Sequence, residues 1–365
     1  MDRSLLDLYS DYLLSSFGQT PATRLSGILH GAMSHDRITR FLSADIPKSK
    51  DLWRIVKRHV REVESPDGIM TIDDSIEEKP YTDENDIVCW HYDHVHGCQT
   101  KGINFMTALY SSKDVSLPVG FQIIAKTETY IDVKTNTEKR RSPTSKNIYY
   151  QRLLQGCTRN AIPFRYVIND VWYASAENMV FVKQTLKKHF LMPLKGNRKV
   201  ALSKTDKRQG KYQAVETLVF KKDNSVQKIY LEGVDFPLLL IKQVFANEDE
   251  STGVRYLVSS DTTLTFERIT TLYRIRWHVE EYHKSLKQNA SLEKSPTRTV
   301  ATQTTHFFSA LCAYIKLEML KVSTHMNHSA LKLNIYMQAL MTAYEQLRSL
   351  QSIRFSKNML LRNIS

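Results

Sequence analysis

The order of strand-like and helix-like segments constrains the fold of this chain more than any other feature. After Ser65-Pro66-Asp67-Gly68, short segments rich in β-branched and aromatic residues predict strands at 69–72, 87–90, 103–110 and 119–124. A helix at 145–155, a strand at 165–168 and a helix at about 175–188 are expected next. Strands followed by alternating helix and strand indicate a mixed α/β sheet.

Helical segments flank this region on both sides. Residues 1–66 predict helices at about 5–13, 22–29, 34–42 and 53–63, with Ser34 as an N-cap. The third of these carries His35, Arg37 and Arg40, which suits either a DNA-facing helix or an ordinary helical hairpin. Near the C-terminus, residues 265–289 predict one long helix and 302–349 a further helical region.

The segment between the two expected halves of the sheet is rich in strands. It predicts strands at 215–220, 227–231, 238–244 and 254–258, and we expect a β-rich insertion over residues 190–262.

The charge of the chain favours a polyanionic partner. Lys and Arg total 51 against 38 Asp and Glu, which gives a net charge of +13 over 365 residues. A surplus of this kind is typical of proteins that bind nucleic acid. No apolar run is long enough for a membrane helix, and the acidic N-terminus does not resemble a signal peptide. With only four cysteines, we expect a reduced protein of the cytosol.

Much of the positive charge lies in one stretch. Twelve basic residues stand against Asp206 and Glu216: Lys183, Lys187, Lys188, Lys195, Arg198, Lys199, Lys204, Lys207, Arg208, Lys211, Lys221 and Lys222. Phe190, Tyr212 and Phe220 are interleaved with them. Basic and aromatic residues together suit a groove that follows phosphates and stacks on bases. No Gly-rich phosphate loop is present, so no nucleotide cofactor is expected.

Three carboxylates are candidates for chemistry. Asp74 and Asp170 each close a predicted strand, where active sites of α/β sheets often form. Glu280 lies in the long helix, and Tyr273, Arg276, Lys284 and Lys287 are spaced to share its face. Such a stripe is also typical of a solvated helix face.

These segments resemble bacterial insertion-sequence transposases of the D-D-E type. The spacing Tyr273-x2-Arg276-x3-Glu280-x6-Lys287 is similar to the Tyr-Arg-Glu-Lys signature of that group. The segments 72–80 and 168–175 resemble its first and second aspartate blocks, and the three blocks stand in the right order.

The resemblance implies a ribonuclease-H-like catalytic core with Asp170 and Glu280 as its second and third carboxylates. The first is Asp74 or its neighbour Asp73, since adjacent strand residues face opposite ways and only one can face a metal. Asp74 is favoured because Ser75 follows it, as a small hydroxyl residue follows the aspartate in the family.

The implied chemistry is metal-dependent cleavage of a phosphodiester. Asp74, Asp170 and Glu280 would bind Mg²⁺, for which Mn²⁺ often substitutes. Arg276 and Lys287 would neutralise DNA phosphates, and Tyr273 would position the strand.

The resemblance also raises the question of base stacking. Trp277 would stack on a flipped base, as in the resembled group, or would pack in the core. The expected insertion has no Trp, so only Phe190, Tyr212 or Phe220 could supply a second stacking residue.

A competing metal site lies between Cys89 and Cys98. His91, His94 and His96 stand between these cysteines, and Cys and His are zinc ligands. The spacing matches no common zinc finger, so we expect structural or DNA-contacting histidines there.

Together these features predict a transposase that cuts double-stranded DNA at terminal inverted repeats and joins the 3′ ends to target DNA. Its binding residues would be Tyr273, Arg276, Trp277, Lys284, Lys287, Lys195, Arg198 and Lys199, and a homodimer is expected in the DNA complex. The expected regions are a helical DNA-binding part (1–66), the catalytic core (67–189 and 263–300), the β-rich insertion (190–262) and a helical C-terminal part (301–365). The alternatives are a silent DNA-binding derivative and a metal-dependent nuclease without strand transfer.

Overall fold

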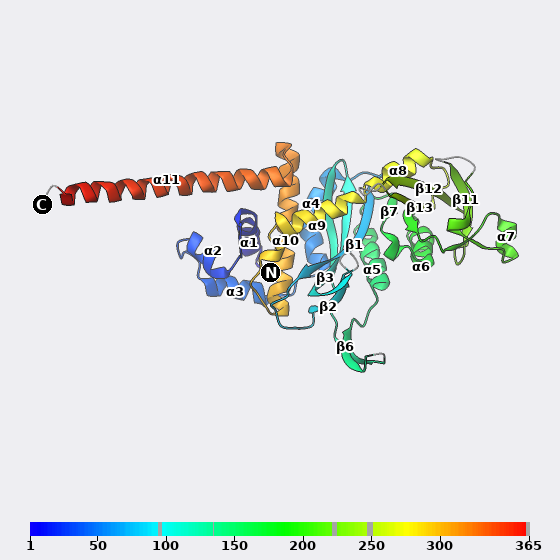
Figure 1. Cartoon of the computed structure of the whole chain (residues 1–365), viewed down its shortest axis with the longest axis horizontal. Coiled ribbons are helices and arrows are strands. Elements are labelled where there is room, and N and C mark those ends of the chain that lie inside the picture. The colour runs from blue at the N-terminus through cyan, green and yellow to red at the C-terminus, as the bar shows by residue number, and fades with distance from the viewer. Residues whose placement is uncertain (94–96, 134, 221–224, 247–250, 363–365) are drawn as a thin grey trace.

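A large mixed sheet with helices on both faces forms the centre of the structure (Figure 1). The computed structural model describes residues 1–93, 97–133, 135–220, 225–246 and 251–362. The sheet has 11 strands: β1 (Ile69–Glu78), β2 (Val88–Asp93), β3 (Cys98–Ser112), β4 (Val115–Ile123), β7 (Tyr166–Ile168), β8 (His189–Leu194), β9 (Lys199–Ala201), β10 (Gln213–Ala214), β11 (Val226–Leu231), β12 (Leu238–Ala246) and β13 (Thr252–Ser259). The predicted α/β class with a mixed sheet is confirmed.

Five strands form the part of the sheet that carries the expected carboxylates. Their order in space is β4-β3-β1-β7-β8. Strands β1, β3 and β4 are antiparallel, whereas β7 and β8 run parallel to β1. This order fits the ribonuclease-H-like arrangement. The carboxyl end of β7 therefore lies beside the middle of β1, where Ile168 pairs with Thr71, and this brings the segments after Ile72 and Ile168 together.

The remaining strands extend the same sheet beyond β8. Strand β13 pairs antiparallel with β8, and β12, β11, β9 and β10 follow in that order. The expected boundary at residue 190 falls inside β8, which pairs in parallel with β7. A separate two-stranded hairpin of β5 (Glu128–Asp132) and β6 (Thr137–Arg141) was not predicted.

The structure differs from three local predictions in this region. Residues 215–220, expected as a strand, contain a single 3-10 turn at Val215–Thr217. The helix expected at 175–188 is α6 (Ala176–Val180) followed by a π-helical turn at Phe181–Thr185. A further short helix, α7 (Lys204–Arg208), lies in the stretch where only strands were expected.

The long helix expected at 265–289 is divided in two. Helix α8 (Phe266–Arg274) ends at a tight turn, and α9 (Trp277–Gln288) begins directly after it. In this turn the amide of Arg276 donates to the carbonyl of Tyr273, three residues back, instead of four. Such 3-10 bonding changes the rotation of the second helix relative to the first, so side chains of α8 and α9 do not form one continuous stripe.

The two faces of the sheet are covered by different helices. On one face, Cys157 of α5 (Lys146–Arg159) contacts Met70 of β1, and α4 (Ser49–Val63) packs on β4. On the other face, Ile69 packs in a cluster with Tyr273 of α8. Since side chains alternate along a strand, the residues of β1 divide between these two faces.

The terminal regions are helical, as expected. Helices α1 (Arg3–Ser15) and α3 (His35–Ala44) pack against α10 (Val300–Thr324), and α2 (Ala22–Ile28) lies between them in sequence. Ser34 caps α3 by accepting from the amide of Arg37, as predicted. Helix α11 (His328–Arg362) extends away from the rest of the molecule (Figure 1). Within the described residues, no helix is both long and apolar enough to cross a membrane.

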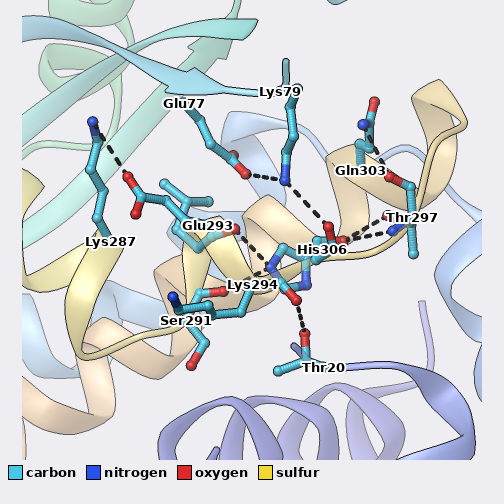
Figure 2. Close-up of polar contacts among 12 residues, drawn as sticks. Thr20, Glu77, Lys79, Lys287, Ser291, Glu293, Lys294, Thr297, Gln303 and His306 are labelled. Carbon is cyan, nitrogen blue, oxygen red and sulfur yellow. Dashed lines mark hydrogen bonds and ion pairs between the residues drawn. The ribbon is translucent and has the colours of Figure 1, made fainter. Parts of the chain in front are cut away.

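A buried polar junction joins β1 to the segment that follows α9 (Figure 2). Glu77 and Lys79, 2% and 7% exposed, form an ion pair of 2.6 Å, and Lys79 also donates to the carbonyl of Ser295. On the same segment, the carbonyl of Lys294 accepts from Thr20, which follows α1. The junction therefore fixes the strand that carries Asp73 relative to both α9 and the N-terminal helices.

His306 of α10 completes this junction with both ring nitrogens. Its Nε2 lies 3.1 Å from the carbonyls of Ser291 and Leu292, and its Nδ1 lies 3.1 Å from the hydroxyl of Tyr9. These contacts hold α1, α10 and the segment after α9 together around one buried ring.

We predict that Lys79→Met lowers the free energy of unfolding by about 3–5 kcal/mol, because it leaves the Glu77 carboxylate buried without its cation. The double variant Glu77→Gln/Lys79→Met should recover part of this loss. Urea unfolding at pH 7 measures both. Arg58→Met, which breaks an exposed ion pair with Glu62, is the control and should cost less than about 1 kcal/mol. Equal losses for the Lys79 and Arg58 variants would contradict the role of the junction.

Candidate active site

Asp73 is the aspartate of β1 that faces the third carboxylate. Ile69, Thr71 and Asp73 alternate onto the sheet face that packs against α8, and the Asp73 side chain reaches Glu280 of α9. A carboxylate oxygen of each, with a ring nitrogen of His283, forms a group in which all three atoms lie within 4.8 Å of one another. Burial, followed by the charges of Asp170, Asp74 and Glu280, raises the pKa of Asp73 well above its usual value.

Asp74 faces the opposite side of the sheet. Its carboxylate accepts hydrogen bonds from Lys146 of α5 at 2.7 Å, from Asn104 of β3 at 3.1 Å and from the hydroxyl of Tyr173. Burial alone would raise the pKa of Asp74, but the Lys146 ammonium and these hydrogen bonds outweigh it and lower the pKa. The residue favoured from sequence is thus held by protein donors, and the structure brings Asp73, not Asp74, together with Glu280 and His283.

Asp170 follows β7 and lies close enough to influence Asp73. It begins the 3-10 turn Val171–Tyr173, and its side chain accepts from the amide of Trp172 at 2.9 Å. Burial is the main cause that raises the pKa of Asp170 to about 6, and the charge of Asp74 adds to it. Because Thr71 of β1 pairs with Ile168 of β7, Asp73 and Asp170 both stand two residues beyond this pair, where β7 ends.

Arg276 lies beside Glu280, as its spacing predicts, and Tyr273 lies against Arg276. The Arg276 guanidinium donates to Glu280 at 2.9 Å and lies 5.9 Å from the centre of the Tyr273 ring. Arg255 of β13 lies on the same ring, at 5.4 Å. The Tyr273 ring is buried in the hydrophobic cluster that Ile69 also joins. Both arginines therefore pack against a ring that is held in place.

Lys287 and Lys284 lie in different surroundings. Lys287 donates to the carbonyl of Ile76 at 3.0 Å and approaches Glu293 at 3.8 Å, so it ties α9 to β1. Lys284 instead lines a cavity of about 340 Å³ with His278 and Glu281. Lys284 stands four residues after Glu280, about 40° further around the helix, and it lines this cavity rather than the group of Asp73, Glu280 and His283.

Exposed tryptophans and basic residues surround the site. Trp277, at the start of α9, is 60% exposed and so does not pack in the core. Lys195 lies 4.9 Å from the ring of Trp172, and a cavity of about 170 Å³ there is also lined by Arg198. Lys199 is exposed at the start of β9. Lys221 and Lys222 of the basic stretch lie outside the described residues.

The aromatic residues proposed for the insertion differ in exposure. Phe190 is fully buried in the core, at an inward position of β8, so of the three alternatives it is the one that cannot stack on a base. Phe220 packs partly against the core, and Tyr212 is half-buried.

The Cys89–Cys98 segment forms a hairpin rather than a ligand cluster in its described part. Cys89 is buried and donates to the carbonyl of Asn85, whereas Cys98 is exposed opposite Asp93. His94 and His96 lie outside the described residues. In the part of the chain that the structure describes, Asp73, Glu280 and His283 form the one group of potential metal ligands.

Sequence reasoning missed three residues of this site. His283 stands three residues after Glu280, and this i, i+3 spacing was the signal that could have found it. Lys146 and Tyr173 reach Asp74 from distant segments, and no local pattern marks them.

The donors at this edge of the sheet fit a divalent cation. Carboxylate oxygens are the ligands that Mg²⁺ and Mn²⁺ prefer. Burial and mutual repulsion raise the pKa values of Asp73 and Asp170, and a cation held among them would offset that repulsion. Asp73 from β1 and Glu280 from α9 reach this place from opposite sides, with Asp170 near Asp73.

We predict that Asp170→Asn stabilises the metal-free protein at pH 8 and has little effect at pH 4. The folded pKa of about 6 exceeds the unfolded value of 3.8, so the unfolded carboxyl ionises first as the pH rises. Ionisation of Asp170 therefore lowers the free energy of unfolding as the pH rises from 3.8 to about 6. At higher pH the full loss remains, on the order of 1–3 kcal/mol. Urea unfolding at the two pH values measures this. Asp67→Asn, at an exposed site, should change stability by less than about 0.5 kcal/mol, and a loss of stability for Asp170→Asn at pH 8 would contradict the account.

Comparison with protein families identifies the superfamily of this chain. The chain matches the family model described as the transposase DDE domain over residues 123–316 and that of the DDE superfamily endonuclease over residues 2–217. No curated protein gave a significant match. Enzymes of the DDE family typically depend on divalent metals and act on DNA. Each match spans more than half of the sequence, and the chain therefore belongs to the DDE transposase and endonuclease superfamily.

Proposed function

We propose that this protein is a transposase of the prokaryotic cytosol that cuts DNA at terminal inverted repeats and joins the 3′ ends to target DNA. The observation that carries the proposal is the convergence of Asp73 and Glu280, from elements that are more than 200 residues apart in sequence, into one group of ligand atoms. Arg276 pairs with Glu280, but Asp73 also lies beside Glu280 and near Asp170, which is more negative charge than a purely structural ion pair needs.

Asp73, Asp170 and Glu280 would hold the divalent cations, with Mg²⁺ as the expected ion and Mn²⁺ as a substitute. Bound in pairs, such ions stabilise the negative charge on the attacking and leaving oxygens of a phosphodiester. Asp74 has a different role in this proposal. Held by Lys146, Asn104 and Tyr173, it would fix the middle of β1 so that Asp73 faces α9.

Basic residues would guide DNA to this edge of the sheet. Arg276 is bonded to Glu280 and would place positive charge beside the scissile phosphate. Lys195 and Arg198 line the cavity next to Trp172, and Lys199 would extend this surface. The exposed ring of Trp277 is available to stack on an unpaired base.

The proposed homodimer would form through α11. Its apolar residues recur in the heptad pattern Leu333, Tyr336, Leu340, Leu347 and Leu350, each between 43% and 59% exposed. Along residues 333–350 the only charged residues are Glu345 and Arg348, and neither lies on this stripe. Two identical copies could therefore pack along it without charge repulsion, and joining two DNA ends requires two active sites.

We predict that the wild-type protein releases the element from a plasmid that carries its ends, only when Mg²⁺ or Mn²⁺ is present. Glu280→Gln should bind the ends but lose roughly 10²-fold or more of the cleavage rate, because one charged metal ligand is replaced by an amide. Gel analysis of the plasmid, with a binding assay on the same DNA, gives both values.

Glu281→Gln is the matched control, since its exposed side chain lines the cavity with Lys284 and it should cleave like wild type. Wild-type cleavage by the Glu280 variant would contradict the site. DNA binding without any cleavage by the wild type would favour the silent derivative, and cleavage without joined products would favour a nuclease.

Leu340→Glu should abolish the dimer that wild type forms on DNA, since it places a charge on the apolar stripe. Sedimentation of the full chain, with and without DNA ends, measures this. Gln338→Glu adds the same charge to the opposite side of α11 and should leave the dimer intact. If both variants sediment as wild type does, α11 is not the dimer contact.

A further inference from the structure

His283 is a buried histidine at the edge of the carboxylate group. It lies one helical turn after Glu280 on α9, is 7% exposed, and offers a ring nitrogen within 4.8 Å of oxygens of Asp73 and Glu280. Its ring is held edge-on against Phe105 of β3, with ring centres 5.8 Å apart. The packing therefore fixes the direction in which its nitrogens point.

The hydrogen bonding of this ring is incomplete. Nε2 of His283 is buried and has no hydrogen-bond partner among the described residues. His306 shows the contrasting case within the same fold, because both of its buried nitrogens have polar partners. A buried polar atom without a partner is costly, so a group that binds there would remove that cost.

We propose that His283 supplies a nitrogen ligand to a divalent cation held by Asp73 and Glu280; this rests on the proposed function of the site. Glu280 and His283 stand in the Glu-x-x-His spacing, which places both side chains on one face of a helix and builds metal centres in other helical proteins. Oxygen and nitrogen ligands converge here from α9 and β1.

A mixed set of ligands has a consequence for metal choice. Mg²⁺ prefers oxygen ligands and gives up its waters reluctantly. Mn²⁺ is the weakest binder among the first-row divalent transition metals, but it accepts an imidazole nitrogen more readily than Mg²⁺ does. The site should therefore bind Mn²⁺ more tightly than Mg²⁺, and the difference should depend on His283.

Mn²⁺ binding to the full-length protein tests this without an activity assay. Electron spin echo spectroscopy of the bound Mn²⁺ should show coupling to a ¹⁴N nucleus in wild type, and His283→Gln should lose this coupling. Titration calorimetry should show a Mn²⁺ affinity lower by about tenfold or more in that variant, with a smaller change for Mg²⁺. His278→Gln, on the same helix but lining a different cavity, is the matched control and should behave as wild type.

These measurements distinguish a wrong role for His283 from a wrong metal site. If Glu280→Gln abolishes Mn²⁺ binding but wild type shows no nitrogen coupling, or if His283→Gln binds as wild type does, the role of His283 is overturned and the carboxylate site stands. If wild type binds neither metal, the proposed site itself is overturned. A second variant, His283→Phe, retains the packing against Phe105, and its thermal unfolding separates loss of a ligand from loss of the fold.

Discussion

The pleat of one strand, β1, determines where chemistry can take place in this protein. Its residues alternate between two faces that are covered by different helices, so that neighbouring aspartates reach different surroundings. Asp74 is directed to α5 and is neutralised there by Lys146. Asp73 is directed to α9, where Glu280 and His283 lie. A shift of one residue in the pairing of β1 with β3 would exchange these roles, and the ten paired positions between the strands oppose such a shift.

The site combines electrostatic repulsion with a rigid frame. Burial and neighbouring negative charges raise the pKa values of Asp73 and Asp170, so the carboxylates disfavour the fold that brings them together. The buried pair of Glu77 and Lys79 and the contacts of the segment after α9 hold β1 and that helix in place. Lys287 adds a direct bond from α9 to the carbonyl of Ile76. A fold that holds such groups close together against their repulsion is suited to bind a cation.

Local patterns predicted the class of the fold and the segments that carry the carboxylates, because strand and helix periodicities and turn residues act over short distances. The choice between Asp73 and Asp74 could not be made in this way, since it depends on which helix covers each face of β1. The break between α8 and α9 was missed because residues 275–276 contain neither Gly nor Pro. Phe190 looked like part of a basic surface, but it lies in β8, whose pairing with β7 is a long-range contact.

The location of a bound cation tests the account most directly. Crystals of the full-length protein grown with Mn²⁺ would give anomalous scattering that marks the ion independently of the protein. The account predicts a peak within bonding distance of Asp73 and Glu280, on the face of β1 that is covered by α9. A peak bound by Asp74 on the α5 face, or no peak at this edge of the sheet, would contradict it.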